Sequence, residues 1–341
     1  MTGAEAPDGL TYAAAGVDTE AAELALSKVK AMVEGTHSAR VLGGIGGFAG
    51  LWDASGLPGE SVLAASADGV GTKLLVAQAM DKHDTVGIDL VAMVVDDLVV
   101  VGARPLFLLD YLAVGRVVPE RVAEIIGGVA RGCQLAGCAL LGGETAEHPG
   151  AMEPDAYDLA GFGVGLAEKN RLLGPERVKA GDILLGLPSS GLHSNGYSLV
   201  RRALAGAGIR YEKYLDELCM TAGEALLAPT RVYAADLVAL LDFGVDVHAM
   251  CHVTGGGLPG NIVRSVPPGL VARIDWSAWS RPPIFEVVRT AGRVGDTELA
   301  HALNLGIGMV LLLPAAEVDR AVEFLGGRGL DAVVIGEVAP A

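Results

Sequence analysis

The sequence predicts a protein of the α/β class, with α+β character, that folds as two domains. Its 341 residues are about twice the length of an average domain. Hydrophobic residues make up 51% of the chain and charged residues 19%, so there is enough apolar material for two packed cores. Short apolar segments alternate with longer helical ones along the chain, and this alternation is typical of layered α/β folds.

The charged segment Glu168 to Asp182 separates two apolar series and marks the expected domain boundary. We expect an N-terminal domain at 19–170 and a C-terminal domain at 171–341, preceded by a flexible arm at 1–18. Apolar runs that end at glycines predict strands, and longer runs with helical periodicity predict helices. The N-terminal elements are helices at 19–34, 87–101 and 119–136 and strands at 62–67, 106–113, 138–141 and 158–167. The C-terminal elements are strands at 183–187 and 247–253 and helices at 196–206 and 220–242. The glycine-dense segment 43–50 predicts a flexible loop, a candidate lid.

Composition excludes several classes of protein. The 25 Lys and Arg against 41 Asp and Glu give a net charge of −16, which disfavours binding to nucleic acid through broad electrostatics. The long stretches without charge contain proline and polar residues, and the N-terminus lacks the basic start and apolar core of a signal peptide. The four cysteines have no metal-binding spacing. We therefore expect a cytoplasmic protein with reduced thiols that binds neither nucleic acid nor a membrane.

Acidic residues mark the first candidate site. Asp89, Asp96 and Asp97 share one face of an otherwise apolar helix. They are either solvated carboxylates on an outer face or, since burial would demand a partner, members of a metal or active site. Asp68 and Glu144 each follow an apolar strand, where α/β domains commonly build their sites. Such an all-oxygen set suits Mg²⁺ holding nucleotide phosphates.

Three loops carry further candidates. Asp68 to Lys73 (DGVGTK) combines glycines, a hydroxyl and a lysine ahead of a helix, a composition suited to phosphate binding. Ser189 to Gly196 contains His193, a candidate acid/base group or phosphate contact, beside Ser194 and Asn195, which are also good helix caps.

The third loop, Gly255 to Gly260, formally matches GxGxxG. Pro259 interrupts that fingerprint, so a phosphate-binding loop is favoured over a dinucleotide site. His248 and His252 lie on a predicted strand without the glutamate of a metalloprotease, which favours a structural role.

Taken in order, the motifs resemble phosphoribosylformylglycinamidine cyclo-ligase, also called aminoimidazole ribonucleotide synthetase. The resemblance spans nearly the whole chain and keeps the family's order and spacing. The matching stretches are YAAAGVD (12–18), GGIGGF (43–48), DGVGTKL (68–74), 83–111, GGETAEHPG (142–150), YDLAGFGVG (157–165), SSGLHSNGYSLVR (189–201), LLAPTRVY (226–233) and HVTGGGLPGNI (252–262).

The resemblance implies an N-terminal mixed or antiparallel sheet that forms a barrel across a homodimer, and a C-terminal α/β sandwich. It implies that ATP and formylglycinamidine ribonucleotide give 5-aminoimidazole ribonucleotide, ADP and phosphate. ATP would phosphorylate the formyl amide oxygen, giving an iminophosphate, and the amidine nitrogen would then close the ring and expel phosphate.

The resemblance also implies roles for individual residues. The expected Mg²⁺ ligands are Asp68, Asp97 and Glu144. His193 and Lys73 are the expected catalytic residues, with Lys73 against the phosphates. The expected ATP-binding residues are Lys30, Asp68, Gly69, Gly71, Thr72 and Asp89. The expected substrate-binding residues are Ser194, Asn195, Gly196, Thr254, Gly255, Gly256 and Gly257.

Asp96 departs from the family, which usually has Asn there, and adds a negative charge beside the expected metal site. Two alternatives stand beside the cyclo-ligase. One is a related ATP-using small-molecule kinase of the same architecture, such as a thiamine-phosphate or selenophosphate-forming enzyme. The other is a non-catalytic nucleotide-binding module, which predicts loss of the acids that this chain retains.

Overall fold

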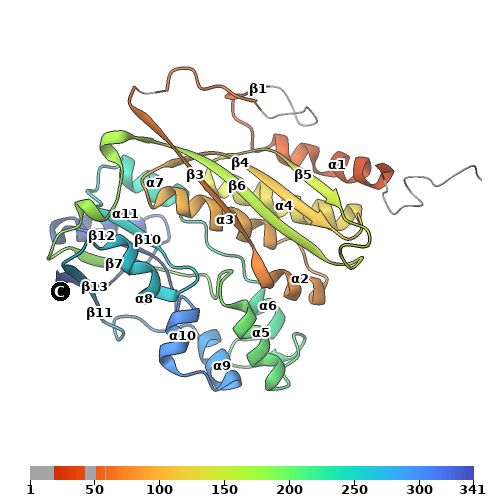
Figure 1. Cartoon of the computed structure of the whole chain (residues 1–341). Helices are drawn as coiled ribbons and strands as arrows, with labels where there is room; N and C mark the ends of the chain where they lie inside the picture. The colour runs from red at the N-terminus through yellow and green to blue at the C-terminus, as the bar shows by residue number, and fades with distance from the viewer. Residues whose placement is uncertain (1–18, 43–50, 58) are drawn as a thin grey trace, which may run out of the picture.

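The computed structural model describes residues 19–42, 51–57 and 59–341. It shows two large sheets, each with its own helices (Figure 1), and two small two-stranded sheets. The predicted N-terminal arm and the predicted lid at 43–50 lie outside the described residues. Among the helices that are described, none is long and apolar enough to cross a membrane.

The N-terminal sheet has the strand order β3-β6-β4-β5. Its strands are β3 (Ser61–Gly69), β6 (Tyr157–Glu168), β4 (Arg104–Val114) and β5 (Ala139–Glu147). β4 and β5 are parallel, and the other neighbours are antiparallel. Parallel neighbours need a long crossover, which α4 (Pro119–Ala136) supplies.

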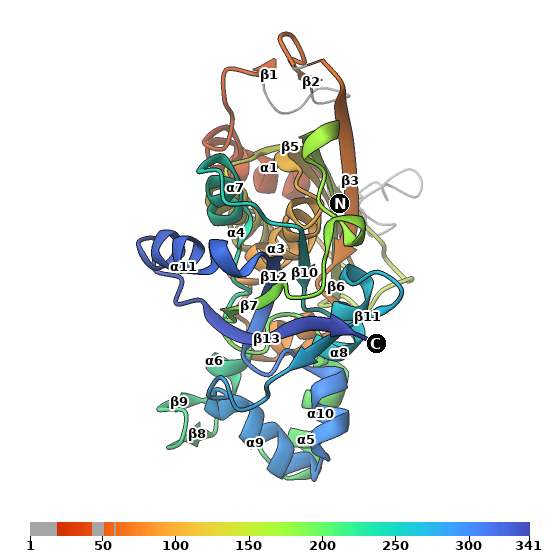
Figure 2. The same cartoon turned by 90° about the vertical axis from the view of Figure 1, so that its left-hand side faces the viewer.

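Helices cover one face of this sheet and leave the other uncovered by described elements (Figure 2). The central helix α3 (Val86–Val99) packs on β3 and β6, and α4 and α1 (Thr19–Glu34) follow outwards. The helix approaches closely because the strand has glycines beneath it: a Cβ on Gly161 would meet Leu90, and one on Gly163 would meet Val94. The glycines of β6 therefore determine on which face of the sheet α3 packs and how closely it approaches.

The C-terminal sheet is antiparallel throughout, with the order β10-β12-β7-β13-β11. Its strands are β10 (Ala249–His252), β12 (Ile307–Leu313), β7 (Ile183–Pro188), β13 (Val333–Pro340) and β11 (Leu270–Ile274). The helices of this half are α5 (Tyr197–Gly206), α6 (Ala222–Leu226), α7 (Ala234–Asp242), α8 (Gly257–Ile262), α9 (Pro283–Gly292), α10 (Asp296–Ala302) and α11 (Val318–Gly326). The short elements are β1 (Val41–Leu42), β2 (Leu51–Trp52), α2 (Leu74–Met80), β8 (Tyr214–Leu215), β9 (Met220–Thr221) and the 3₁₀ turn η2 (Gly71–Lys73).

One predicted helix is wrong. The expected helix at 220–242 is two helices, α6 and α7, joined by a non-helical segment that contains Pro229. Proline disfavours helical backbone at the residue before it and cannot donate the next hydrogen bond, so the chain leaves the helix there. The predicted strand at 138–141 also continues to Glu147, because its second half pairs with β4.

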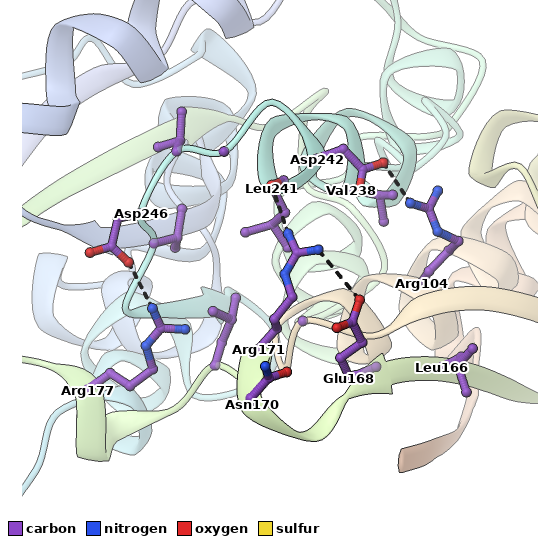
Figure 3. Close-up of a pocket in the computed structure, with 16 residues that line it drawn as sticks. Arg104, Leu166, Glu168, Asn170, Arg171, Arg177, Val238, Leu241, Asp242 and Asp246 are labelled. Carbon is purple, nitrogen blue, oxygen red and sulfur yellow. Dashed lines mark hydrogen bonds and ion pairs between the residues drawn. The ribbon is translucent and has the colours of Figure 1, made fainter. Parts of the chain in front are cut away.

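The two halves meet along α3 and at a cleft of about 430 Å³. This cleft, seen in Figure 3, lies beside the segment 168–182 that joins the halves. Arg104 of β4 pairs with Asp242 of α7 across this joint, at 2.6 Å. Arginines dominate the cleft's positive charge, but each has an acidic partner. The pairs are Arg104–Asp242, Arg171–Glu168 and Arg177–Asp246. The cleft is thus an electrically balanced joint between the halves.

Candidate functional site

The acidic face of α3 lies along the seam between the two halves. The Asp89 Oδ1 atom accepts the Thr230 N–H at 2.7 Å, and the Asp96 Oδ1 atom accepts the Tyr233 N–H at 2.9 Å. Asp97 Oδ1 lies 2.9 Å from His252 Nδ1. The spacing correctly predicted one shared face. Two of the three carboxylates, however, bind backbone of the C-terminal half, which explains how a buried acid is tolerated there.

Asp96 is completely buried, as Asp89 is. Burial raises its pKa to about 7, and the hydrogen bond from the Tyr233 backbone lowers it only in part. The Asp96 carboxylate thus caps the start of α7.

Asp68, Asp97 and His252 form the open end of the seam. Asp68 ends β3, and both burial and the charge of Asp97 raise its pKa. His252 is buried, which opposes its charged form, but its bond to Asp97 and the surrounding carboxylates raise its pKa overall. The side chain of Asp97 is 43% exposed, so this cluster reaches solvent. Two carboxylates and one imidazole therefore share this end of the seam.

His252 lies in this cluster, although its position on a predicted strand favoured a structural role. It is the last residue of β10, directly before the Thr254 loop. His252, like Asp68, is a polar residue at the end of a strand, where α/β domains commonly build their sites.

Glu144 does not join this cluster, which corrects the expected set of three carboxylates. It sits on β5, three strands from the β3 strand of Asp68, on the order of 14 Å at ordinary strand spacing. It pairs with Tyr111 and lies on the exposed side of the sheet, whereas Gly161, the partner of Asp68, faces α3. Among the described residues, no three His, Cys, Asp or Glu side chains are grouped for a metal.

The first two candidate loops lie against each other. Thr72 Oγ1 is 3.2 Å from Ser198 Oγ, which joins the DGVGTK loop to the start of α5. Gly71 adopts φ +73° with open space where a Cβ would be, and the Asp68 carboxylate accepts the Gly69 N–H at 2.7 Å. The loop therefore lies next to the open end of the seam, with room for a ligand beside Gly71.

Lys73 and Asp89 are buried side by side, which corrects their expected contact with phosphates. Both side chains are 0% exposed, and their ion pair is 2.8 Å long. Lys73 Nζ also donates to the backbone carbonyls of His193 and Ala228. A fully buried, fully hydrogen-bonded ammonium has no donor left for a ligand.

His193 is held as a neutral imidazole. It is 2% exposed, and burial, ahead of the nearby positive charges, holds its pKa well below the usual range. Its Nε2 accepts the Ser190 N–H at 3.2 Å, while Nδ1 has no partner among the described residues. The ring therefore carries its proton on the buried Nδ1 atom, and the expected catalytic role of His193 stays a prediction.

The third candidate loop is fixed by one amide side chain. Asn261 Nδ2 donates to the carbonyls of Thr254, Gly255 and Gly257. Gly256 and Gly257 have positive φ, which glycine permits without strain. A Cβ on Gly255 would lie 3.5 Å from Asn195 Oδ1, so this loop adjoins the loop of His193 and Gly196.

Lys30 lies apart from these loops. It is exposed on α1 with Glu34 4.0 Å away, and α1 packs on α4 and β5. The structure thus brings together Asp68, Asp97, His252 and the three loops, but not Lys30 or Glu144.

The buried Asp110 on β4 predicts a pH effect on stability. Burial, reinforced by the charge of Glu144, raises its pKa to about 7. Because the folded pKa lies above the unfolded one, ionisation opposes folding increasingly from about pH 4 to pH 7. We expect Asp110→Asn to gain stability relative to the parent chain across that window, by a few kcal/mol at most. Urea unfolding at pH 5 and pH 8 measures this, and an equal difference at both values would contradict it.

Comparisons with known proteins identify the family of this chain. The model for "AIR synthase related protein, N-terminal domain" matches residues 48–167, and that for the "C-terminal domain" matches 179–341. The phosphoribosylformylglycinamidine cyclo-ligase of Shouchella clausii (strain KSM-K16) is 50% identical over 331 residues, with 96% of each chain covered. The enzyme of that name from Geobacillus kaustophilus (strain HTA426) is 51% identical and covers 96% of this chain and 95% of its own.

Solved structures share the fold at lower identity. Thiamine-monophosphate kinase from Stenotrophomonas maltophilia K279a has a TM-score of 0.67 at 20% identity, covering 94% of this chain and 95% of its own. E. coli HypE has a TM-score of 0.65 at 20% identity, covering 94% and 91%. These two likenesses establish the architecture.

Proposed function

Because the chain belongs to the phosphoribosylformylglycinamidine cyclo-ligase family, we propose that its reactants meet at the open end of the α3 seam. Members of this family are ligases of purine biosynthesis that form a carbon–nitrogen bond. The seam supports this proposal because it is the place where the carboxylates and three loops from both halves converge.

The observation that carries the proposal is the pairing of Asp68 with Asp97. Each is an acid beside another acid, and this proximity contributes to the raised pKa of Asp68. Hard oxygen donors at a partly exposed position fit Mg²⁺, which completes its coordination with water and phosphate oxygens. When bound, Mg²⁺ would neutralise charge on ATP phosphates, a role that this acidic site could not otherwise fill.

The two C-terminal loops supply the polar groups for the ribonucleotide. The amide of Asn195 and the Thr254–Gly257 loop are the donors in this proposal, and the glycines of the loop let a ligand approach its backbone. We place the formyl amide oxygen between these donors and the ATP-binding carboxylates. Its phosphorylation makes a leaving group, and attack by the amidine nitrogen closes the ring and releases phosphate.

Removal of the metal tests the carboxylate pair. We expect EDTA to weaken ATP binding by more than about tenfold, since the phosphates then face two uncompensated carboxylates. Calorimetric titration with and without Mg²⁺ measures the change, and adenosine serves as the control because it has no phosphates. ATP binding that EDTA leaves unchanged would contradict the metal assignment.

The uncovered face of the N-terminal sheet supports the homodimer. This face exposes large apolar side chains on three adjoining strands, with Leu63 at 65%, Tyr111 at 45% and Phe162 at 43% exposure. An apolar sheet face of this kind is typical of a protein interface. We propose that a second copy of the chain covers it and that the two sheets together close a barrel.

A charge on that face should separate the copies. We expect Phe162→Glu to weaken self-association by about 100-fold or more, because the charge would be buried against an apolar partner. Sedimentation equilibrium measures it. Tyr214→Glu, a similar change on the exposed β8 strand, is the control and should leave association unchanged. A dimer that survives Phe162→Glu with unchanged affinity would place the interface elsewhere.

A further inference from the structure

The buried ion pair of Lys73 and Asp89 connects three segments that are distant in sequence. Lys73 closes the η2 turn of the N-terminal half, and Asp89 lies in the first turn of α3. The acceptors of the ammonium on the other side are the carbonyls of His193, at 3.1 Å, and Ala228, at 2.7 Å. Together with Asp89, they use all three ammonium protons.

Asp89 continues the same network into the C-terminal half. Its Oδ1 accepts both the N–H and the hydroxyl of Thr230, at 2.7 and 2.6 Å. The Thr230 hydroxyl oxygen in turn lies 2.9 Å from the Ser194 hydroxyl. His193 and Ser194, two consecutive residues of the loop 189–196, are therefore tied to the N-terminal half through this ion pair.

The tie acts on a strained part of the loop. His193 adopts φ +62°, a left-handed conformation that residues other than glycine rarely adopt. The carbonyl that Lys73 binds belongs to this residue. The loop at 190–195 and the segment at 227–233 are outside regular helices and strands, so no sheet or helix hydrogen-bond ladder fixes them. Strained backbone persists where surrounding contacts over-determine it.

We propose that Lys73 and Asp89 are positioning residues that hold the His193–Asn195 loop in its working conformation at the seam. They are not catalytic residues, because neither side chain has any exposed surface from which to touch a ligand. The kinetic consequences of this inference rest on the proposed function, but its structural consequence does not.

The expected consequence is local disorder of the loop when the ammonium is removed. In Lys73→Met, we expect amide hydrogen exchange at 190–195 to accelerate by about tenfold or more, and by a larger factor than exchange in the buried β12 strand. Turnover should fall by about 100-fold, since small misplacement of positioned groups has effects of that size. The KM for the ribonucleotide should rise more than the KM for ATP, because the proposed function places the ribonucleotide, and not ATP, against this loop.

A double variant separates positioning from simple stabilisation. Lys73→Met alone leaves Asp89 buried without its cation and is expected to lose stability. Lys73→Met/Asp89→Asn removes both charges, while the amide keeps an acceptor for the Thr230 N–H. We expect it to recover the melting temperature and yet to keep the fast exchange at 190–195 and the raised ribonucleotide KM.

Arg104→Met is the matched control, because it breaks another ion pair between the halves that lies at the joint in Figure 3. It should leave loop exchange and both KM values unchanged. The inference is overturned if the double variant has normal loop exchange, or if Arg104→Met disturbs the loop as much. If the parent protein showed no cyclo-ligase activity, the proposed function would fail, but the exchange comparison, which needs no substrate, would still decide the inference.

Discussion

Asp68→Asn should lower turnover by about 100-fold or more while leaving the melting temperature unchanged or slightly raised. The loss is expected because the carboxylate is one of two that can hold Mg²⁺, and even residues that only support a metal ligand are worth about 10- to 100-fold. Stability should not fall, because Asp68 and Asp97 repel each other and burial raises the pKa of Asp68. Parallel assays of ADP release and of thermal unfolding measure the two effects.

Asp158→Asn is the control for that experiment. The Asp158 carboxylate accepts the N–H of the next residue at 2.9 Å, as the Asp68 carboxylate does at 2.7 Å, and it lies in the same sheet. It shares the local geometry without a neighbouring acid of α3. Normal activity is expected in this variant. If Asp68→Asn were equally active, the metal assignment would be wrong.

Gly87→Ala should cause a large loss of stability in the N-terminal half. A Cβ at Gly87 would lie 2.1 Å from the Val129 nitrogen and 2.4 Å from the Ile125 carbonyl oxygen, both backbone atoms of α4. Backbone cannot rotate away, so α3 and α4 must separate. We expect a cost of about 2 kcal/mol or more, despite the higher helix propensity of alanine. Urea unfolding measures it.

Gly206→Ala provides the comparison, since this glycine ends α5 and has nothing within 4 Å of a Cβ. It should be neutral or stabilise by up to about 1 kcal/mol. If the two variants were equally stable, the close approach of α3 to α4 would be refuted. Because α3 also carries Asp97, the separation in Gly87→Ala should reduce activity as well.

The sequence indicated the chemistry of the site better than its geometry. Helical periodicity placed Asp89, Asp96 and Asp97 on one face, and the structure agrees. Periodicity does not reveal what lies opposite a face. Here the partners are backbone N–H groups of residues 230 and 233, which only the packing of the two halves brings to the helix.

Lys73 and Glu144 show two further limits. A lysine after a glycine loop suggests a phosphate contact, but the carbonyls that surround Lys73 come from residues 193 and 228, more than 100 positions away. Glu144 and Asp68 each follow a predicted strand, yet their separation depends on strand order, which one sequence does not give. Residue type and local spacing pointed to loops that the structure places side by side. They do not give the distance between residues on different strands of the sheet.

The proposed cyclo-ligase reaction can be measured by incubating the purified protein with Mg²⁺, ATP and formylglycinamidine ribonucleotide and following ADP and 5-aminoimidazole ribonucleotide together. We expect the two products to form one to one, and neither to form when Mg²⁺ is removed by EDTA. ADP formation without the imidazole product, or no product from folded protein, would contradict it.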